Sequence, residues 1–374
     1  MVRCDSSTAL NPGDRAVVRG KIYPFTARHG GYGRLMTRRG YVGTLYLNRS
    51  SLLLRDTLHR ELSPKHLSLF LHERAVARLD RLALAPDEQA LCNAMTAGDR
   101  RSLSPALRAA YSRSGTSHLL AVSGLHVGIV FLLANLLLWW LPLFRHGHIL
   151  RNIAVILLIW LYAATTGFPP SVVRATLMFS VLQFALASSS EYVGMNTLAG
   201  VAFVMLLFHP DYLFDISFQL SFIAVAGIIA WGLPLCRLLR TRRKSIDMLT
   251  ATLAIGFSAS AATAPLISHT FGQISVVGLA LNPVVILLSY VVVGSCTLWL
   301  VIPGTVLAPL FSVVAGFAAR AQNELIRAAA ALPAAALDIR LTTTQCWIVY
   351  GLFIFATLLL WSAERKKSVS SLPE

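Results

Sequence analysis

The chain has 374 residues, of which 55% are hydrophobic and 13% are charged, and its formal net charge is +16 at pH 7. Soluble domains carry roughly 25% charged residues, so this composition excludes an ordinary soluble domain and indicates a polytopic membrane protein. The five cysteines form no Cys-x-x-Cys pair, which argues against a zinc ribbon, a redox motif and a disulfide framework.

Residues 1–50 have the composition of short β-strands. The segments "RAVVRGKIYPF" and "RLMTRRGYVGTLYL" mix β-branched and aromatic residues, with the turn "RHGGYG" between them. We predict a partial Greek-key barrel of the OB type. Its aromatic and basic side chains either contact a single strand of nucleic acid or fill the barrel core, and the candidate contact residues are Arg19, Tyr23, Arg38 and Tyr41.

Residues 51–116 read as a linker region of amphipathic helices, because apolar residues recur at helical spacing among charges. Pro64, Pro86 and Pro105 interrupt this helical pattern, and so do Gly98 and Gly115. The first 116 residues hold 19 Lys/Arg against 9 Asp/Glu. Such a basic region suits nucleic acid or anionic lipid headgroups, and a solvated domain that binds neither is the alternative.

From residue 117 onward, apolar segments alternate with short polar joints. We predict a transmembrane domain over 117–361, followed by a cytoplasmic tail over 362–374. Because 306–332 carries charges at helical spacing, its second half should face the interface or other helices rather than lipid. The nine candidate spans are 118–143, 151–166, 171–188, 194–209, 216–235, 248–268, 274–302, 306–332 and 345–361.

The basic joints predict the orientation in the membrane. The segments "RHGHILR", "RLLRTRRK" and "ERKKS" fall on the same side if the chain crosses nine times, and basic joints favour the cytoplasm. We therefore expect a multi-pass protein of the inner membrane with residues 1–116 outside and the C-terminus in the cytoplasm. The first residues contain no apolar stretch of the signal-peptide kind.

Polar side chains interrupt the apolar part of the chain, and none of them is a carboxylate in the middle of a span. This argues against a carrier driven by protons or sodium. On a continuous helix Ser123 and His126 would share a face, and with His118 they would form a polar stripe. Gly124 and Gly128, four residues apart, would let a neighbouring helix approach closely.

Two further polar positions each allow two interpretations. Arg174 follows the pair Pro169–Pro170, which suits a helix N-terminus, and it either contacts a phosphate at the mouth of a passage or reaches out to lipid headgroups. Gln219 lies in an apolar helix and either joins two helices or lines a hydrated path.

We considered three kinds of chemistry for these residues. A serine hydrolase built on Ser123 and His126 needs the base to approach from another element, and two residues on one helix are poorly placed for it. Two histidines without a third ligand are weak evidence for a metal, and "HGH" at 146–148 lacks the carboxylate of a metal nuclease. We therefore predict no catalytic residue, no metal, no cofactor and no enzymatic activity. The chain has no phosphate-binding G-x-x-x-x-G-K-[ST] motif, so a motor must be another protein.

Four segments, in order along the chain, carry a further signal. They are "AGDRRSLSPALRAAYSRSGTSHLLAVSGLHVGIV", "GFPPSVVRATLM", "ISFQLSFIAVAGI" and "ATAPLISHTFGQISVVGLALNPVV". Together they resemble the signature of the ComEC competence proteins, the inner-membrane channels of natural DNA uptake, and they cover roughly residues 90–300.

The resemblance implies that a single strand of DNA passes through the membrane domain into the cytoplasm during transformation. It implies that the passage is lined or framed by Ser117, His118, Ser123, Gly124, His126, Arg174, Gln219, Gln273 and Asn282. Hydroxyls, amides and imidazoles could replace the hydration of a phosphate without trapping the strand.

The resemblance also has limits. Members of that family usually have leading transmembrane helices, and many end in a nuclease domain, so we do not transfer nuclease activity to this chain. The partners expected are single-stranded DNA, the lipid bilayer, a separate nuclease, a DNA receptor, a cytoplasmic motor and further copies of the chain. The alternatives are a degenerate or structural membrane protein without transport, or an intramembrane serine hydrolase.

Overall fold

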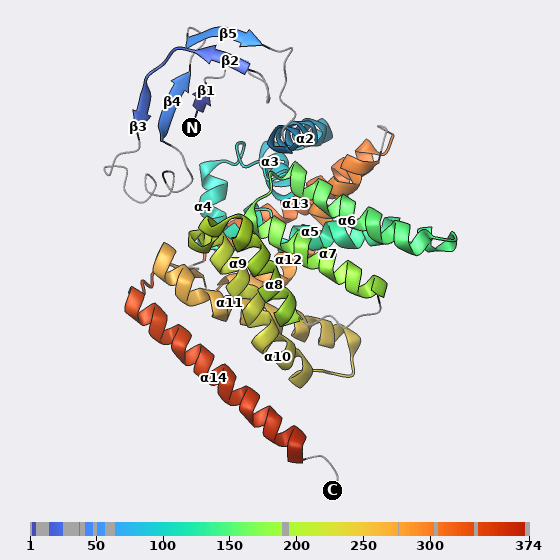
Figure 1. The fold of residues 1–374 in the computed structure, drawn as a ribbon, viewed down its shortest axis with the longest axis vertical. Helices are drawn as coiled ribbons and strands as arrows, with labels where there is room; N and C mark the ends of the chain where they lie inside the picture. The colour runs from blue at the N-terminus through green and yellow to red at the C-terminus, as the bar shows by residue number, and fades with distance from the viewer. Residues whose placement is uncertain are drawn as a thin grey trace.

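The computed structural model describes residues 2–4, 15–24, 37, 42–47, 51–56, 64–188, 194–275, 277–302, 306–332 and 336–370. A small β region lies beside a body of helices, as Figure 1 shows. The chain is therefore mostly helical, as its composition indicates.

Five short strands make up the described β region: β1 (Val2–Cys4), β2 (Arg15–Val18), β3 (Ile22–Pro24), β4 (Gly43–Leu47) and β5 (Leu52–Asp56). Strand β4 pairs in parallel with β1 and antiparallel with β3, while β2 pairs antiparallel with β5. The β character of the region is confirmed. The described strands form two small sheets, so the OB-like barrel stays a prediction.

The interpretation of residues 51–116 as helical was wrong at its start. Residues Leu52–Asp56 form strand β5, with Leu54 opposite Val17 of β2. A short apolar run cannot be assigned to helix or strand by periodicity alone, and here the ladder to β2 decides.

The rest of that region is helical, and its prolines mark the starts of helices. Pro64, Pro86 and Pro105 open α2 (Pro64–Leu79), α3 (Pro86–Thr96) and α4 (Pro105–Arg113). Proline is tolerated there because the first N–H groups of a helix have no partner inside it. The Ser104 hydroxyl accepts a hydrogen bond from the Leu107 N–H at 3.2 Å and so caps α4.

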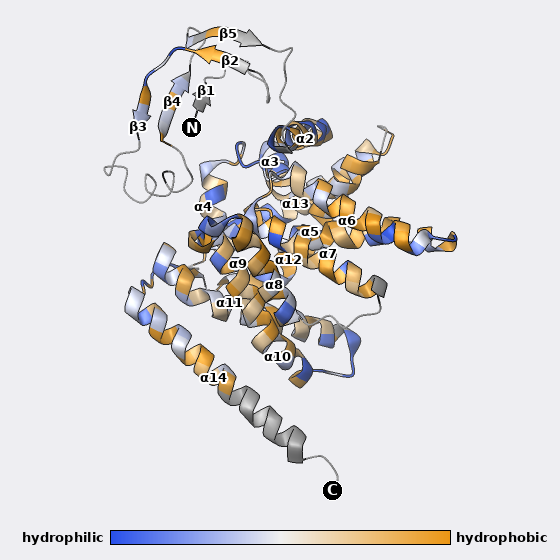
Figure 2. Ribbon diagram, in the orientation of Figure 1, coloured by the Kyte–Doolittle hydropathy of each residue, from blue (hydrophilic) through white to orange (hydrophobic). Residues whose placement is uncertain are grey.

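The helices that follow α4 are mostly apolar, as Figure 2 shows. The longer ones are α5 (Gly124–Leu137), α6 (Gly147–Thr165), α7 (Pro170–Ser188), α8 (Gly194–Phe208), α9 (Ile216–Gly227), α11 (Lys244–Phe271), α12 (Val277–Val301), α13 (Ala308–Ala330) and α14 (Thr343–Ser370), and the short turns are η4 (Ser117–Leu120), η5 (Leu141–Leu143) and η6 (Pro210–Phe214). Between α9 and α11 lie a π-helical turn at Ile228–Gly232 and the short α10 (Leu233–Leu238).

Within the described residues, five helical stretches are long and apolar enough to cross a membrane. These are Gly124–Leu143, Gly147–Thr165, Ile216–Leu238, Ile246–Phe271 and Ala280–Val301. Three shorter apolar helices cover Pro170–Leu186, Gly194–Phe208 and Thr343–Leu358. The chain thus has the apolar helices of a membrane protein, and the total of nine spans stays a prediction.

Helix α13, the predicted span 306–332, contacts the amphipathic helices through its second half. Asn323 accepts a hydrogen bond from the Tyr111 hydroxyl at 3.0 Å, and Arg320 pairs with Glu88 of α3 at 2.7 Å. The prediction that this half faces other helices is confirmed. Helices α2, α3, α4, α12 and α13 share one hydrophobic core, so the amphipathic region is docked on the membrane helices.

The joint between α11 and α12 is in close contact with the turn that leads to α5. Gly115 has a φ of +74°, and a Cβ placed on it would lie 2.3 Å from the Cβ of Ser275. A Cβ on Gly278 would lie 2.9 Å from the carbonyl oxygen of Ser114. Ser275 lies in β6 (Ile274–Ser275), which pairs with β7 (Ala336–Leu337) in the joint before α14. Three joints of the chain therefore meet at this contact.

Candidate functional site

Helix α5 begins at Gly124, later than the span predicted from residue 118. Residues Ser117–Leu120 form the separate turn η4, and Ser123 has an extended backbone at the N-cap of α5. The continuous helix through 118–143 was wrong at its start, because serine is a preferred N-cap residue and its side chain competes with the helix for backbone groups. Ser123 and His126 therefore form a cap and not one face of a helix.

The Ser123 cap is closed by His126, three residues into the helix. The Ser123 N–H donates to Nδ1 of His126 at 3.0 Å, and the Ser123 hydroxyl lies 2.9 Å from the same nitrogen. An Nδ1 that accepts from an N–H assigns the ring hydrogen to Nε2. The His126 side chain is fully buried, and its Nε2 has no hydrogen-bond partner among the described residues. The cap thus holds an unpaired N–H donor inside the protein.

The Ser123–His126 distance would allow proton transfer, but the surroundings do not resemble a hydrolase. The lone pair of Nδ1 already accepts from the backbone, and no described carboxylate bonds to the ring to orient it. The geometry therefore favours capping over activation of the hydroxyl.

Arg174 approaches this cap from α7. A Cβ placed on Gly124 would lie 3.2 Å from a terminal nitrogen of the Arg174 guanidinium. The guanidinium carbon also lies 5.7 Å from the centre of the Phe222 ring on α9, and another terminal nitrogen lies 3.8 Å from the Met178 sulfur. Arg174 is only 6% exposed, so it does not reach out to lipid headgroups. The side chain is enclosed between α5, α7 and α9.

The positive charge of Arg174 is not neutralised within the part of the chain that the structure describes. The ion pairs there join Asp99, Glu88, Asp87 and Glu324 to other arginines. The Nε of Arg174 is buried and has no hydrogen-bond partner among the described residues. An isolated charge away from water is costly, so an anion or water beside Arg174 would stabilise this arrangement.

The α5 N-terminus adds to the positive potential around Arg174. The first N–H groups of a helix have no partner inside it, and the helix dipole places about half a positive charge there. The absence of a side chain at Gly124 lets the guanidinium come this close, as the Gly124/Gly128 spacing predicts. Gly128 lies against the ring of Phe179, also on α7. Two sources of positive charge therefore converge at one buried point.

Apolar residues surround this point. Val122, Val127, Ile159 and Val172 belong to one buried cluster of α5, α6 and α7. The Tyr162 hydroxyl of this cluster and the Thr176 hydroxyl of α7 are buried without a hydrogen-bond partner among the described residues. No group of three or more His, Cys, Asp or Glu in the described residues could hold a metal ion.

A comparison with known families bears on this arrangement. The family model for "Competence protein" matches residues 95–366, which include the cap and Arg174. The chain belongs to the competence protein family.

Two curated relatives match this competence protein over about half of its length. The chain is 32% identical over 204 residues to ComE operon protein 3 of Bacillus subtilis (strain 168), and this match covers 53% of the chain and 24% of the relative. The chain is 30% identical over 201 residues to an uncharacterized protein of Aquifex aeolicus (strain VF5), and this match covers 53% of the chain and 45% of the relative. The matched segments therefore span less than half of either relative. No solved structure matches the chain.

The structure of this competence protein brings together four of the residues singled out in its sequence: Ser123, Gly124, His126 and Arg174. Ser117 and His118 are exposed and lie in η4, just before the cap. Gln219 donates to the Leu213 carbonyl at 2.8 Å, a local contact with the turn before α9, and its place along a passage stays a prediction.

The remaining predicted residues lie elsewhere. Gln273 is exposed in the joint after α11, and Asn282 lies in α12 with a buried oxygen that has no hydrogen-bond partner among the described residues. In the β region Arg19 and Tyr23 are exposed, and Tyr23 makes an edge contact with Tyr46. Arg38 and Tyr41 lie outside the described residues.

The sequence did not reveal a second polar cluster, which lies toward the other end of α5 and α7. Arg151 donates to Asn135 at 2.9 Å, and Gln183 donates to Asn152 at 2.7 Å. Asn135 is nine residues after His126, which is about 14 Å along a helix. Part of the signal was present, because Asn135, Asn152 and Gln183 interrupt apolar segments and Arg151 ends a basic joint, but only the fold shows that they meet.

Proposed function

We propose that this protein passes a single strand of DNA across the inner membrane during natural transformation, and that Arg174 with the α5 N-terminus contacts its phosphates. The observation that carries the proposal is the burial of the Arg174 charge, without a described carboxylate, against a helix N-terminus. Backbone N–H groups and a guanidinium are the donors that bind phosphate in proteins.

Membership of the competence family supports the choice of DNA as the anion. A phosphodiester backbone presents about one charge per nucleotide, so successive phosphates can occupy the same site in turn. A single arginine, helped by the neutral Nε2–H of His126, binds a phosphate without the multiple fixed charges that would hold the strand in place. The site therefore suits a DNA strand that moves past it better than one that stays bound.

The proposed passage needs other proteins for its remaining steps. The strand must be separated from its complement outside and drawn in from the cytoplasm, and we assign these tasks to a separate nuclease, a DNA receptor and a motor. The protein itself acts without catalysis or cofactor in this proposal, with residues 1–116 outside and the C-terminus inside.

The test is DNA uptake by a deletion strain that expresses the full chain with Arg174→Gln. Because a hydrogen bond between charged groups contributes about 1.5–3 kcal/mol, we expect uptake to fall by roughly 10-fold or more. Arg174→Lys should keep part of the uptake, since it retains the charge and loses the fork of donors. Membrane fractions must contain equal amounts of each variant.

Arg145→Gln is the matched control, because Arg145 is exposed in the joint between α5 and α6. It should leave uptake unchanged. Uptake at the wild-type rate by Arg174→Gln would overturn the proposal and favour a structural protein without transport.

A further inference from the structure

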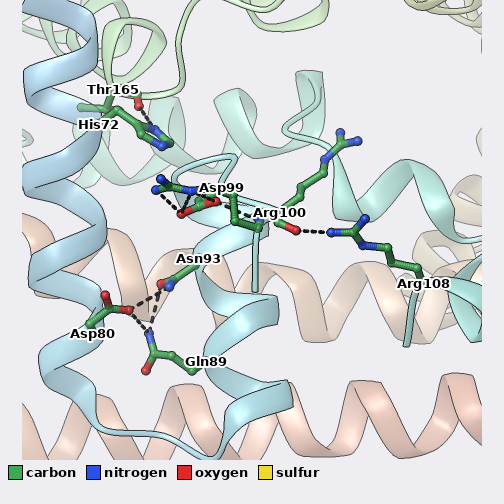
Figure 3. A network of polar contacts seen from close by, with 9 residues as sticks. His72, Asp80, Gln89, Asn93, Asp99, Arg100, Arg108 and Thr165 are labelled. Carbon is green, nitrogen blue, oxygen red and sulfur yellow. Dashed lines mark hydrogen bonds and ion pairs between the residues drawn. The ribbon is translucent and has the colours of Figure 1, made fainter. Parts of the chain in front are cut away.

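Arg100, Arg101 and Arg108 lie at the turn between α3 and α4, and their hydrogen-bond partners differ. Figure 3 labels Arg100 and Arg108. Arg101 is neutralised by Asp99, since its Nε and a terminal nitrogen lie 2.9 Å and 2.7 Å from the two carboxylate oxygens. Arg108 donates to the backbone carbonyl of Arg100. Neither Arg100 nor Arg108 has a carboxylate partner within the described residues.

The guanidinium of Arg108 is therefore held against the backbone of Arg100, and the two like charges interact. Both are exposed, and α4 contains no acidic residue that could offset them. Desolvation by the surrounding protein atoms, although part of the side chain stays exposed, together with the positive charge of Arg108 lowers the pKa of Arg100. An arrangement in which two cations weaken each other is stabilised when an anion lies between them.

The position of the pair connects it with the site at α5. The turn begins at Gly98, whose φ is +82°, and a Cβ placed there would lie 3.3 Å from the Val122 side chain. Val122 directly precedes the Ser123 cap, and its carbonyl accepts from Ser171 at 3.0 Å. Arg100 is two residues from Gly98 and Gly124 is two residues from Val122, and each step spans at most about 7 Å. A short stretch of strand can reach both sites.

We propose that Arg100 and Arg108 form an outer phosphate-binding site that receives the DNA strand before it reaches Arg174. This inference rests on the proposed function and adds a site to it. The ligand is the phosphodiester backbone, because two guanidinium groups recognise phosphate oxygens and present no apolar surface for stacking bases. This site would recognise the phosphodiester backbone of the DNA and not its base sequence.

The structure favours a strand over a lipid headgroup as the source of that phosphate. The Asp99–Arg101 pair braces the turn internally, and the close approach of Gly98 to Val122 places the turn beside the residues that lead to the Ser123 cap. A site that bound only lipid headgroups would not need the contact between Gly98 and Val122, which links the turn to the start of α5.

The experiment measures binding of a fluorescent single-stranded oligonucleotide to the full chain in lipid nanodiscs of zwitterionic composition. Each phosphate contact contributes about 0.7 to the slope of log affinity against log salt concentration for single strands. The variant Arg100→Gln/Arg108→Gln should therefore lower the magnitude of that slope by about 1.4 and weaken binding at low salt.

The control is Arg74→Gln/Arg81→Gln, which removes two exposed arginines from the neighbouring α2 and the turn after it. It should change the slope much less than the Arg100/Arg108 variant does. Equal slopes for the two double variants would overturn the inference.

Two further outcomes distinguish failure of this inference from failure of the proposed function. In nanodiscs that contain anionic lipid, the Arg100→Gln/Arg108→Gln variant could retain less anionic lipid than the wild type and bind the single strand equally well. That result would assign the pair to lipid headgroups, and it would overturn this inference and leave the proposed function intact. Uptake that depends on Arg174 and not on Arg100 and Arg108 would also leave the proposed function standing. A wild-type protein that binds no single strand would overturn both.

Discussion

The backbone N–H of Ser123 donates to Nδ1 of His126, so a histidine inside α5 caps the helix to which it belongs. In the usual capping box a Glu or Gln side chain at this position reaches back to the N-cap. Histidine performs the same task here and keeps a second, buried N–H group at Nε2. Capping and ligand binding can therefore be separated by substitution.

We expect His126→Ala to destabilise the protein by about 1 kcal/mol, because it removes the partner of the Ser123 N–H. His126→Gln should recover most of that stability, since glutamine completes a capping box. DNA uptake should stay low in both variants if Nε2–H contacts the strand. Thermal unfolding in detergent and uptake in cells are the measurements, and wild-type uptake by His126→Gln would contradict the role of Nε2.

We expect Gly124→Ala to reduce uptake, because the new methyl group would lie 3.2 Å from the Arg174 guanidinium and displace it. Gly124→Val should reduce uptake further. Gly256→Ala is the matched control, since nothing lies within 4 Å of the position that its Cβ would occupy. That control should leave uptake unchanged and stabilise α11 by up to about 1 kcal/mol. Equal uptake by Gly124→Val and the control would disprove the contact.

We expect the Asp99–Arg101 pair to give a stability that disappears in acid. The hydrogen bond from Arg101 lowers the pKa of Asp99. A carboxyl whose pKa is lower in the folded state stabilises the protein above its unfolded pKa of about 3.9, and this contribution is lost as the pH falls through the folded value. Asp99→Asn should therefore cost about 1–3 kcal/mol at pH 7 and progressively less below pH 4.

The pH series for Asp99→Asn is compared with that for Asp211→Asn, an exposed carboxylate in the turn before α9. A difference between wild type and Asp99→Asn that stays constant from pH 7 to pH 3 would mean that the pair contributes nothing through its charge.

We expect labelling of single cysteines to give the orientation predicted from the basic joints. In a variant without native cysteines, Asp211→Cys should react with an impermeant maleimide in intact cells. Arg242→Cys, in the joint between α10 and α11, should react only after the inner membrane is permeabilised. The opposite pattern would reverse the orientation and place the Arg174 site at the cytoplasmic end of the proposed passage.

Local signals in the sequence predicted the starts of helices and their close contacts. Pro86 and Pro105 open helices, Gly98 and Gly115 have positive φ, and Gly128 admits a neighbouring ring, because each depends on the geometry of one residue or its nearest turn. The same local view failed where two local preferences compete. Ser123 lies in an apolar run that reads as helix, and its preference for the N-cap ends the helix there.

The candidate site was only partly predictable for a different reason. Whether Arg174 is buried depends on how α5, α7 and α9 pack, and residues 124, 174 and 222 are far apart in the chain. No periodicity links Phe222 to Arg174. The resemblance to a family pointed to the segments that contain Gly124 and Arg174, and only the fold distinguished a buried cation from one that extends to the membrane surface.

The contact of Gly115 with Ser275 has a mechanical consequence. Because neither Gly115 nor Gly278 can gain a side chain without a clash, the turn before η4 and the joint between α11 and α12 are in tight contact, and β6 and β7 join the second of these to the joint before α14. Displacing any one of these three joints would therefore break its contacts with a neighbouring joint.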